Sequence, residues 1–167
     1  MNYMRYALVF LCIYCYPINT DREAYRYCVT HPDTFIGIVW PINPGNDETI
    51  KKILRQYGTI HYQKNVRLTY NQAFELLQKT HRRITDMKEH VRWYFPDDTF
   101  KKPARIFVLT FNNADTAVLC KHAIRHRFIN LQYRSIHIND THEETVELAR
   151  FFFRTKGRYV YRNSIKS

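Results

Sequence analysis

Phe35-Ile-Gly-Ile-Val-Trp40 is a continuous apolar run, and its length is that of a β-strand. Pro41 and Pro44 stop the run, because proline has no backbone N–H to donate within a sheet. The run therefore predicts a first strand, from which the rest of the domain can be followed along the chain.

Helices and strands alternate after this strand. Asn46 or Asp47 caps a helix that Gly58 closes, and partial alternation over residues 59–68 predicts a second strand. Thr69 caps a further helix, and residues 84–95 form another helical stretch. The remaining predicted elements are a strand at 106–111, a helix opened by Asn113, a strand at 133–138, and a last helix opened by the capping-box sequence Thr141-His-Glu-Glu144.

This order predicts an α/β (α+β) domain over residues 35–153. Two split βαβ units give a ferredoxin-like antiparallel sheet with helices packed on one face. A doubly wound parallel sheet is the alternative, and it is disfavoured because no glycine-rich phosphate loop follows Trp40. Residues 17–34 are interpreted as a linker or a short helix capped by Asp21, and residues 154–167 as a basic tail.

Residues 1–16 hold one cation, Arg5, followed by an apolar run from Tyr6 to Tyr16. The run fits a signal peptide and is too short to span a bilayer, but no A-x-A-like cleavage site follows. The competing interpretation is a β-strand or buried segment packed on the domain. A cytoplasmic location is slightly favoured over secretion. Cys12 and Cys15 form a CxxC without a second pair, which favours buried thiols over a zinc or redox site.

The composition is that of a packed globular protein with excess positive charge. Apolar residues make up 45% of the chain, which excludes a disordered polypeptide. The balance of 26 Lys and Arg against 15 Asp and Glu gives a net charge of +11. Such a charge favours anionic partners such as nucleotides or nucleic acid, although it is equally consistent with simple solubility.

The strand-to-helix junction that begins at His137 is the candidate functional site. His137 precedes a helix start, where free backbone N–H groups favour an anion, and Asp140 and Glu143 follow it. Asn139-Asp-Thr141 is also a glycosylation sequon, and a sugar there would block this site. His122 and His126 share a helical face but lack a further ligand, so no metal site is predicted.

Several motifs in shared order resemble the nucleoside diphosphate kinase family. Leu68-Thr69-x-x-Gln72-Ala73-x-Glu75 is similar to the family's L-T-x-x-Q-A-x-E. Pro103 and Asn113-Ala114 match the spacing of a P before the third strand and an N-A after it. His137-Ile-Asn-Asp140-Thr141-His-Glu143 follows H-G-S-D-S-x-E, and Phe151-Phe-Phe153 falls where the family carries aromatic residues in its last helix.

The resemblance implies nucleotide phosphoryl transfer through a phosphohistidine at His137. Asp140, Glu143 or Glu147 would orient the ring. Arg125 and Arg134 would hold the phosphates, and Trp40 would lie at the nucleotide site. The implied partners are a nucleotide with Mg²⁺, possible further anionic ligands such as nucleic acid, and other copies of the chain in a homo-oligomer.

The sequence also departs from the family. Trp40-Pro41-Ile42 replaces K-P-D, so the phosphate-binding lysine is missing. Arg134 replaces the Asn of N-x-x-H, and Ile138 replaces the Gly after the histidine. The short interval between Arg125 and His137 leaves no room for the Kpn loop. Two hypotheses follow: a divergent phosphotransferase, or a catalytically degenerate module that binds a nucleotide, nucleic acid or a protein.

Overall fold

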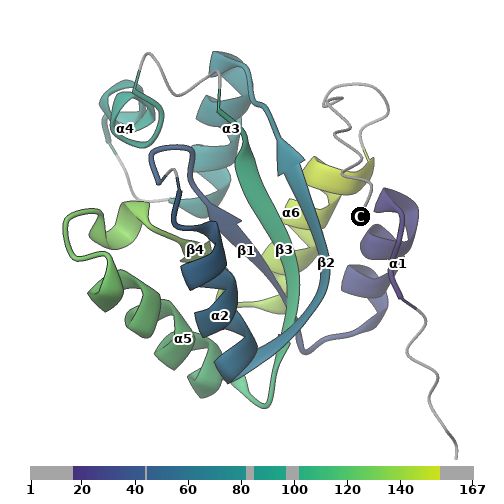
Figure 1. The fold of residues 1–167 in the computed structure, drawn as a ribbon. Helices are drawn as coiled ribbons and strands as arrows, with labels where there is room; N and C mark the ends of the chain where they lie inside the picture. The colour runs from purple at the N-terminus through teal and green to yellow at the C-terminus, as the bar shows by residue number, and fades with distance from the viewer. Residues whose placement is uncertain (1–16, 44, 82–84, 97–101, 155–167) are drawn as a thin grey trace, which may run out of the picture.

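A four-stranded antiparallel sheet forms the centre of the domain. The computed structural model describes residues 17–43, 45–81, 85–96 and 102–154, so the apolar N-terminal segment and most of the basic tail lie outside the described residues. The strands β1 (Thr34–Val39), β2 (Gly58–Val66), β3 (Ala104–Phe111) and β4 (His137–Ile138) lie in the order β2-β3-β1-β4, and each neighbouring pair is antiparallel (Figure 1). The predicted ferredoxin-like sheet is confirmed, and the parallel alternative is wrong.

Side-chain caps explain where several helices begin. Thr69, Asn113 and Thr141 each accept a hydrogen bond from the backbone N–H three residues later, as the sequence predicted.

None of the described helices is long and apolar enough to cross a membrane. The helices are α1 (Asp21–Thr30), α2 (Asp47–Tyr57), α3 (Tyr70–Thr80), α4 (Met87–Tyr94), α5 (Ala114–Arg127) and α6 (His142–Ala149), with a 3-10 turn η2 (Gln132–Arg134) and a π-helical turn η3 (Arg150–Arg154).

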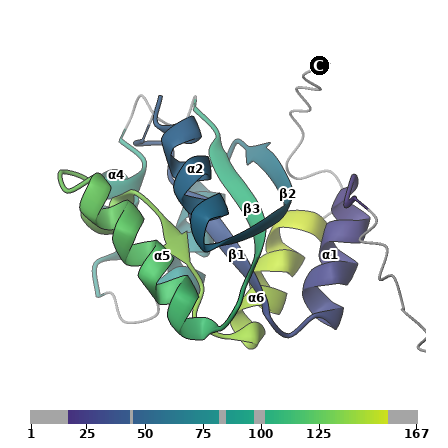
Figure 2. The same ribbon diagram turned by 60° about the horizontal axis from the view of Figure 1, so that its bottom comes forward.

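Helices cover both faces of the sheet, which corrects the prediction of a single covered face. Alternate residues of β1 enter two separate cores. Phe35 and Val39 pack with α2 and α5, whereas Ile36 and Ile38 pack with α1, α3, α4 and α6. Figures 1 and 2 show α2 and α5 on one side of the sheet and α1 and α6 on the other. A continuous apolar strand is the pattern expected when both faces are buried.

Residues 21–30 form a helix that belongs to the domain core. Thr20, one residue earlier than expected, caps α1 in a capping box with Glu23. Ala24 and Cys28 are fully buried in the same cluster as Ile36 and Ile38. Of the two interpretations of residues 17–34, the short helix is therefore the one observed, and the linker interpretation is wrong for this stretch.

The fourth strand is shorter than predicted. Only His137–Ile138 pairs with β1, opposite Ile38 and Gly37. The earlier part of the predicted strand at 133–138 is occupied by η2, since the backbone N–H and the hydroxyl of Ser135 both donate to the Gln132 carbonyl, at 3.0 and 2.6 Å. These local hydrogen bonds replace the ladder bonds that a longer strand would make.

Candidate functional site

Asn139 fixes the junction between β4 and α6. Its side chain continues the sheet, because the Ile36 N–H donates to Oδ1 at 2.5 Å. Its Nδ2 donates to the Thr141 carbonyl and to the Thr145 hydroxyl, both at 2.7 Å, and Thr145 in turn donates to the Thr34 carbonyl. Asn139 is buried with both amide atoms bonded, so the folded domain leaves no room for a sugar on the sequon.

Glu144 holds the ring of His137. The Nε2 atom of His137 lies 3.0 Å from Oε1 of Glu144, and both side chains are largely buried. The other carboxylate oxygen of Glu144 accepts from the Asp140 N–H at 3.2 Å, and its own N–H donates to the capping hydroxyl of Thr141. The carboxylate is thus anchored in the first turn of α6, and the contact leaves Nδ1 as the ring nitrogen that Glu144 does not hold.

The carboxylates predicted to orient His137 lie elsewhere. Asp140 is paired with Lys121 of α5 at 2.5 Å, and Glu143 is exposed. Glu147 is paired with Lys79 at 3.0 Å, which joins α6 to α3. The structure therefore places none of the three beside His137, and Glu144 takes the position that the sequence assigned to them.

A cavity of about 500 Å³ lies between α4 and the segment around η2. His81 lines the cavity, and His137 lies behind it. The centroids of the two rings are 5.8 Å apart. Trp93 and Tyr133 are exposed by 52% and 62%, so two aromatic faces are accessible beside the cavity. The lining residues are His81, His90, Trp93, Tyr94, Asn130, Leu131, Gln132, Tyr133 and Arg134.

The hydrogen bonds of His81 fit a neutral imidazole with its proton on Nδ1. The Thr80 hydroxyl donates to the Leu76 carbonyl at 3.1 Å, so its oxygen is free to accept from Nδ1–H of His81 at 2.8 Å. Nε2 then accepts from the Tyr94 hydroxyl at 3.1 Å. Burial lowers the pKa of His81 to about 4.

The charges around His81 reinforce its neutral state. His137, His90 and Arg125 each lower its pKa further, and Glu144 opposes them. Because the folded-state pKa lies below the ordinary value of 6.5, the unfolded chain takes up a proton at this residue before the folded protein does.

Stability should therefore fall as the pH falls. We expect the free energy of unfolding to decrease between about pH 6.5 and pH 4, by at most about 3 kcal/mol from His81. Urea denaturation across this range measures the slope. His81→Gln should flatten it, whereas His122→Gln, at an exposed position on α5, should not. An equal slope in His81→Gln and the wild type would assign the effect to other groups.

Two arginines bring positive charge to the cavity region. Arg134 lines the cavity, and its guanidinium donates one long hydrogen bond, of 3.5 Å, to the Asn130 carbonyl. The Arg125 guanidinium lies 4.6 Å from the Tyr133 ring centroid. Burial lowers the pKa of Arg125, and its buried Nε has no hydrogen-bond partner among the described residues. Half-buried, incompletely bonded cations of this kind suit an anionic ligand.

Trp40 belongs to the core and not to the cavity wall. Its side chain is fully buried and contacts Tyr94 and Phe95 edge-on, with ring centroids 4.8 and 5.8 Å apart. The predicted place of Trp40 at the nucleotide site is therefore not observed: the indole lies behind Tyr94, which itself lines the cavity.

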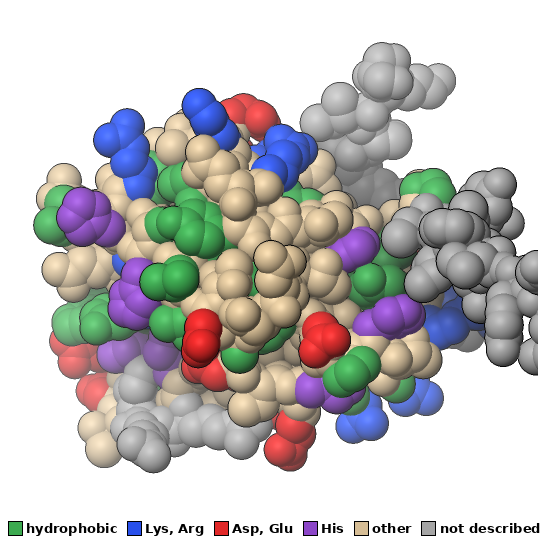
Figure 3. All heavy atoms as spheres, turned by 90° about the horizontal axis from the view of Figure 1, so that it is seen from below, with side chains coloured by type: hydrophobic (Ala, Val, Ile, Leu, Met, Phe, Trp, Pro, Cys, Tyr) green, Lys and Arg blue, Asp and Glu red, His purple; other side chains and the backbone are tan. Residues whose placement is uncertain are grey.

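The histidine pair on α5 and the surface charge are two further features that the sequence singled out. His122 and His126 are exposed on α5, and no group of three or more metal-ligating side chains occurs in the described ranges. Figure 3 shows a face on which Lys and Arg side chains lie apart from one another at the rim, among histidine, acidic and apolar side chains. On that face the positive charge does not form a continuous stripe of the kind that tracks a nucleic-acid backbone.

Sequence reasoning missed His81, His90, Tyr94 and Glu144. Glu144 could be recognised from the sequence as the last residue of the predicted capping box. Its side-chain contact with His137 could not, because that contact depends on the turn between β4 and α6. His81 and Tyr94 lie on the other side of β3 in the sequence, and no local pattern relates them to His137.

A solved structure resembles this arrangement. The orthorhombic crystal structure of the Aquifex aeolicus nucleoside diphosphate kinase matches with a TM-score of 0.50 and 16% sequence identity, over 77% of this chain and 99% of that one. The fold is nucleoside-diphosphate-kinase-like. At this identity the likeness concerns the fold alone. No protein-family model and no curated protein matches the chain.

Proposed function

We propose that the chain binds a nucleoside di- or triphosphate in the cavity between α4 and η2 and transfers a phosphoryl group through Nδ1 of His137. The observation that carries this proposal is the 3.0 Å contact between His137 Nε2 and Glu144. A proton held on Nε2 by the carboxylate leaves a lone pair on Nδ1, which is the form of imidazole that attacks phosphorus.

The surrounding residues supply the other requirements of such a reaction. Phosphoryl transfer depends on positioning and on cations near the phosphoryl oxygens. Arg134 lines the cavity, and Arg125 influences His81 and Tyr94 electrostatically. In the proposed step the Nδ1 lone pair forms a bond to phosphorus while the bond to the leaving diphosphate oxygen breaks, and a second nucleoside diphosphate reverses the transfer. Because the described residues hold no cluster of three or more His, Cys, Asp or Glu side chains that could bind a metal ion, Mg²⁺ would be held mainly by the nucleotide phosphates and water.

A second candidate is a binding module without turnover. It is favoured by the burial of His137, which is 8% exposed and does not line the cavity, so that a ligand meets His81 first. In this case nucleotide binding would remain and phosphorylation would be absent.

The test is incubation of the full chain with γ-labelled ATP and Mg²⁺. Acid-labile label is expected on the wild type and on His122→Ala, and none on His137→Ala. Binding is followed separately by tryptophan fluorescence, because Trp93 lines the cavity and Trp40 is buried; Trp93→Phe should abolish the signal change. Binding without label supports the binding module, and absence of both rejects both candidates.

A further inference from the structure

The outward face of α5 carries apolar side chains. On its inward face, Ala117, Cys120 and Ile124 pack against α2 and β3. The outer face of a surface helix is normally charged or polar, so apolar residues on that side are unusual. Six exposed residues at helical spacing, which we call the α5 stripe, lie opposite the buried ones: Asp115, Val118, Leu119, His122, His126 and, just past the end of the helix, Ile129.

The apolar part of the α5 stripe is well exposed. The exposed fractions of Val118, Leu119 and Ile129 are 41%, 59% and 63%. Figures 1 and 2 show α5 along the outer margin of the molecule. Single exposed apolar residues are common on protein surfaces, but several on one face mark an interaction surface.

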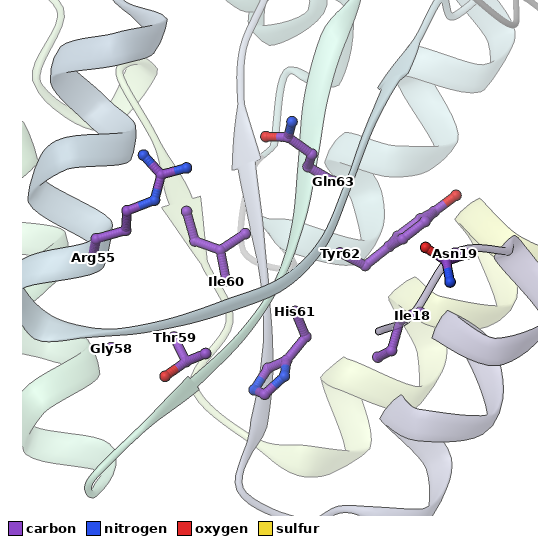
Figure 4. Close-up of a pocket in the computed structure, with 9 residues that line it drawn as sticks. All are labelled: Ile18, Asn19, Arg55, Gly58, Thr59, Ile60, His61, Tyr62 and Gln63. Carbon is purple, nitrogen blue, oxygen red and sulfur yellow. The ribbon is translucent and has the colours of Figure 1, made fainter. Parts of the chain in front are cut away.

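The groove along β2 is a different kind of surface. It has a volume of about 590 Å³, and Arg55 and Gln63 are among the polar side chains that line it (Figure 4). Its hydrophobic side chains, Ile18, Ile60 and Tyr62, are each only partly exposed. The α5 stripe therefore offers a protein partner more accessible apolar surface than this groove does.

The charges of α5 fit a second copy of the same helix. Its first turn carries Asp115 and its last turn carries Arg127, and both side chains are exposed. In an antiparallel pair the first turn of each helix meets the last turn of the other, so opposite charges and opposite ends of the helix dipoles come together. A parallel pair would place like charges together.

The α5 stripe does not suit an anionic partner, because none of its six residues is lysine or arginine. Lys121 of α5 is only 7% exposed and pairs with Asp140, and the Arg125 guanidinium lies over the ring of Tyr133. Nucleic acid or an anionic membrane would need cations along this face. The composition of the stripe therefore favours a protein surface.

We propose that two copies of the chain form a dimer through their α5 stripes, which pack antiparallel about a twofold axis. With the axis near Leu119, the Val118 and Leu119 side chains of the two copies pack on one another. Asp115 of each copy then lies opposite His126 of the other, close to Arg127. A twofold axis makes both ends of the interface identical, so each favourable contact occurs twice.

Sedimentation velocity of the full chain at micromolar concentrations tests the proposal. An interface of one helix from each copy belongs to the small class, below about 1,200 Å², so the dimer should dissociate to monomers on dilution below this range. Leu119→Lys places a charge in the centre of the interface and should weaken the dimer about thirtyfold or more. Val29→Lys places the same charge at another exposed apolar position, on α1, and should leave dimerisation unchanged. A monomeric wild type, or a dimer that persists in Leu119→Lys, would overturn the proposal.

Charge reversal tests the antiparallel orientation. Asp115→Arg and Arg127→Asp should each weaken the dimer about fivefold, because each places like charges together at both ends of the interface. The double variant restores opposite charges and should recover the wild-type dissociation constant. Circular dichroism checks that each variant keeps its helices. A double variant that dimerises no better than the single ones would contradict the proposed arrangement.

Discussion

Replacing Trp40 with alanine is expected to lower the free energy of unfolding by about 3–5 kcal/mol. The indole is fully buried, and removing it leaves a cavity beside Tyr94 and Phe95, which cannot close around the missing ring without losing their own contacts. Trp40→Phe keeps an aromatic ring and removes an indole N–H that has no hydrogen-bond partner among the described residues, so it should cost less. Denaturant unfolding followed by circular dichroism measures both variants.

Trp93→Ala is the matched control for Trp40→Ala. Trp93 is 52% exposed, so its removal should change stability by no more than about 0.5 kcal/mol while weakening any ligand that uses the cavity. The opposite pattern, with Trp40→Ala stable and deficient in binding, would restore the prediction from sequence that Trp40 itself forms the ligand site.

The parts of the fold that follow local rules could be predicted from the sequence. The continuous apolar runs of β1 and β3 mark strands because both of their faces are buried. Thr69, Asn113 and Thr141 mark helix starts because a short polar side chain satisfies a free N–H at that position. These signals fix the order of elements, from which the antiparallel sheet follows.

Predictions failed where tertiary contacts decide the structure. Residues 17–34 are polar in composition, and yet Ala24 and Cys28 are buried in the core that contains Ile36 and Ile38. Their burial can be inferred only when it is known that helices cover both faces of the sheet. Tyr133 has strand propensity, but the turn bonds of Ser135 to Gln132 prevent an extended backbone there.

In the candidate site, too, local rules predicted some features and tertiary contacts decided the others. His137 could be placed from its position before a helix cap. The sequence could not show which nearby carboxylate holds His137, because this depends on the tertiary neighbour of each one. Asp140 pairs with Lys121, Glu147 pairs with Lys79, and Glu144 contacts His137. His81 and Tyr94, which line the cavity, come from the α3–α4 region. The packing of that region against η2 brings them near His137.

Glu144→Gln is expected to slow phosphorylation of His137 by about a hundredfold or more, if the proposed transfer takes place. Glutamine can still accept the hydrogen bond from Nε2–H. It cannot neutralise the positive charge that the ring gains when Nδ1 bonds to phosphorus, and this charge develops in a largely buried position where water screens it poorly. The initial rate of acid-labile labelling from γ-labelled ATP measures the effect.

Glu143→Gln is the control that isolates this contact. Glu143 lies in the same first turn of α6, so its substitution removes the same charge from the same helix terminus, but its side chain is exposed. Labelling of Glu143→Gln should match the wild type. If both variants lose rate equally, the charge at the start of α6 acts through its general field. If only Glu143→Gln loses rate, the contact between His137 and Glu144 serves stability alone. Glu143 would then be the residue that orients His137, after it moves into place when the nucleotide binds.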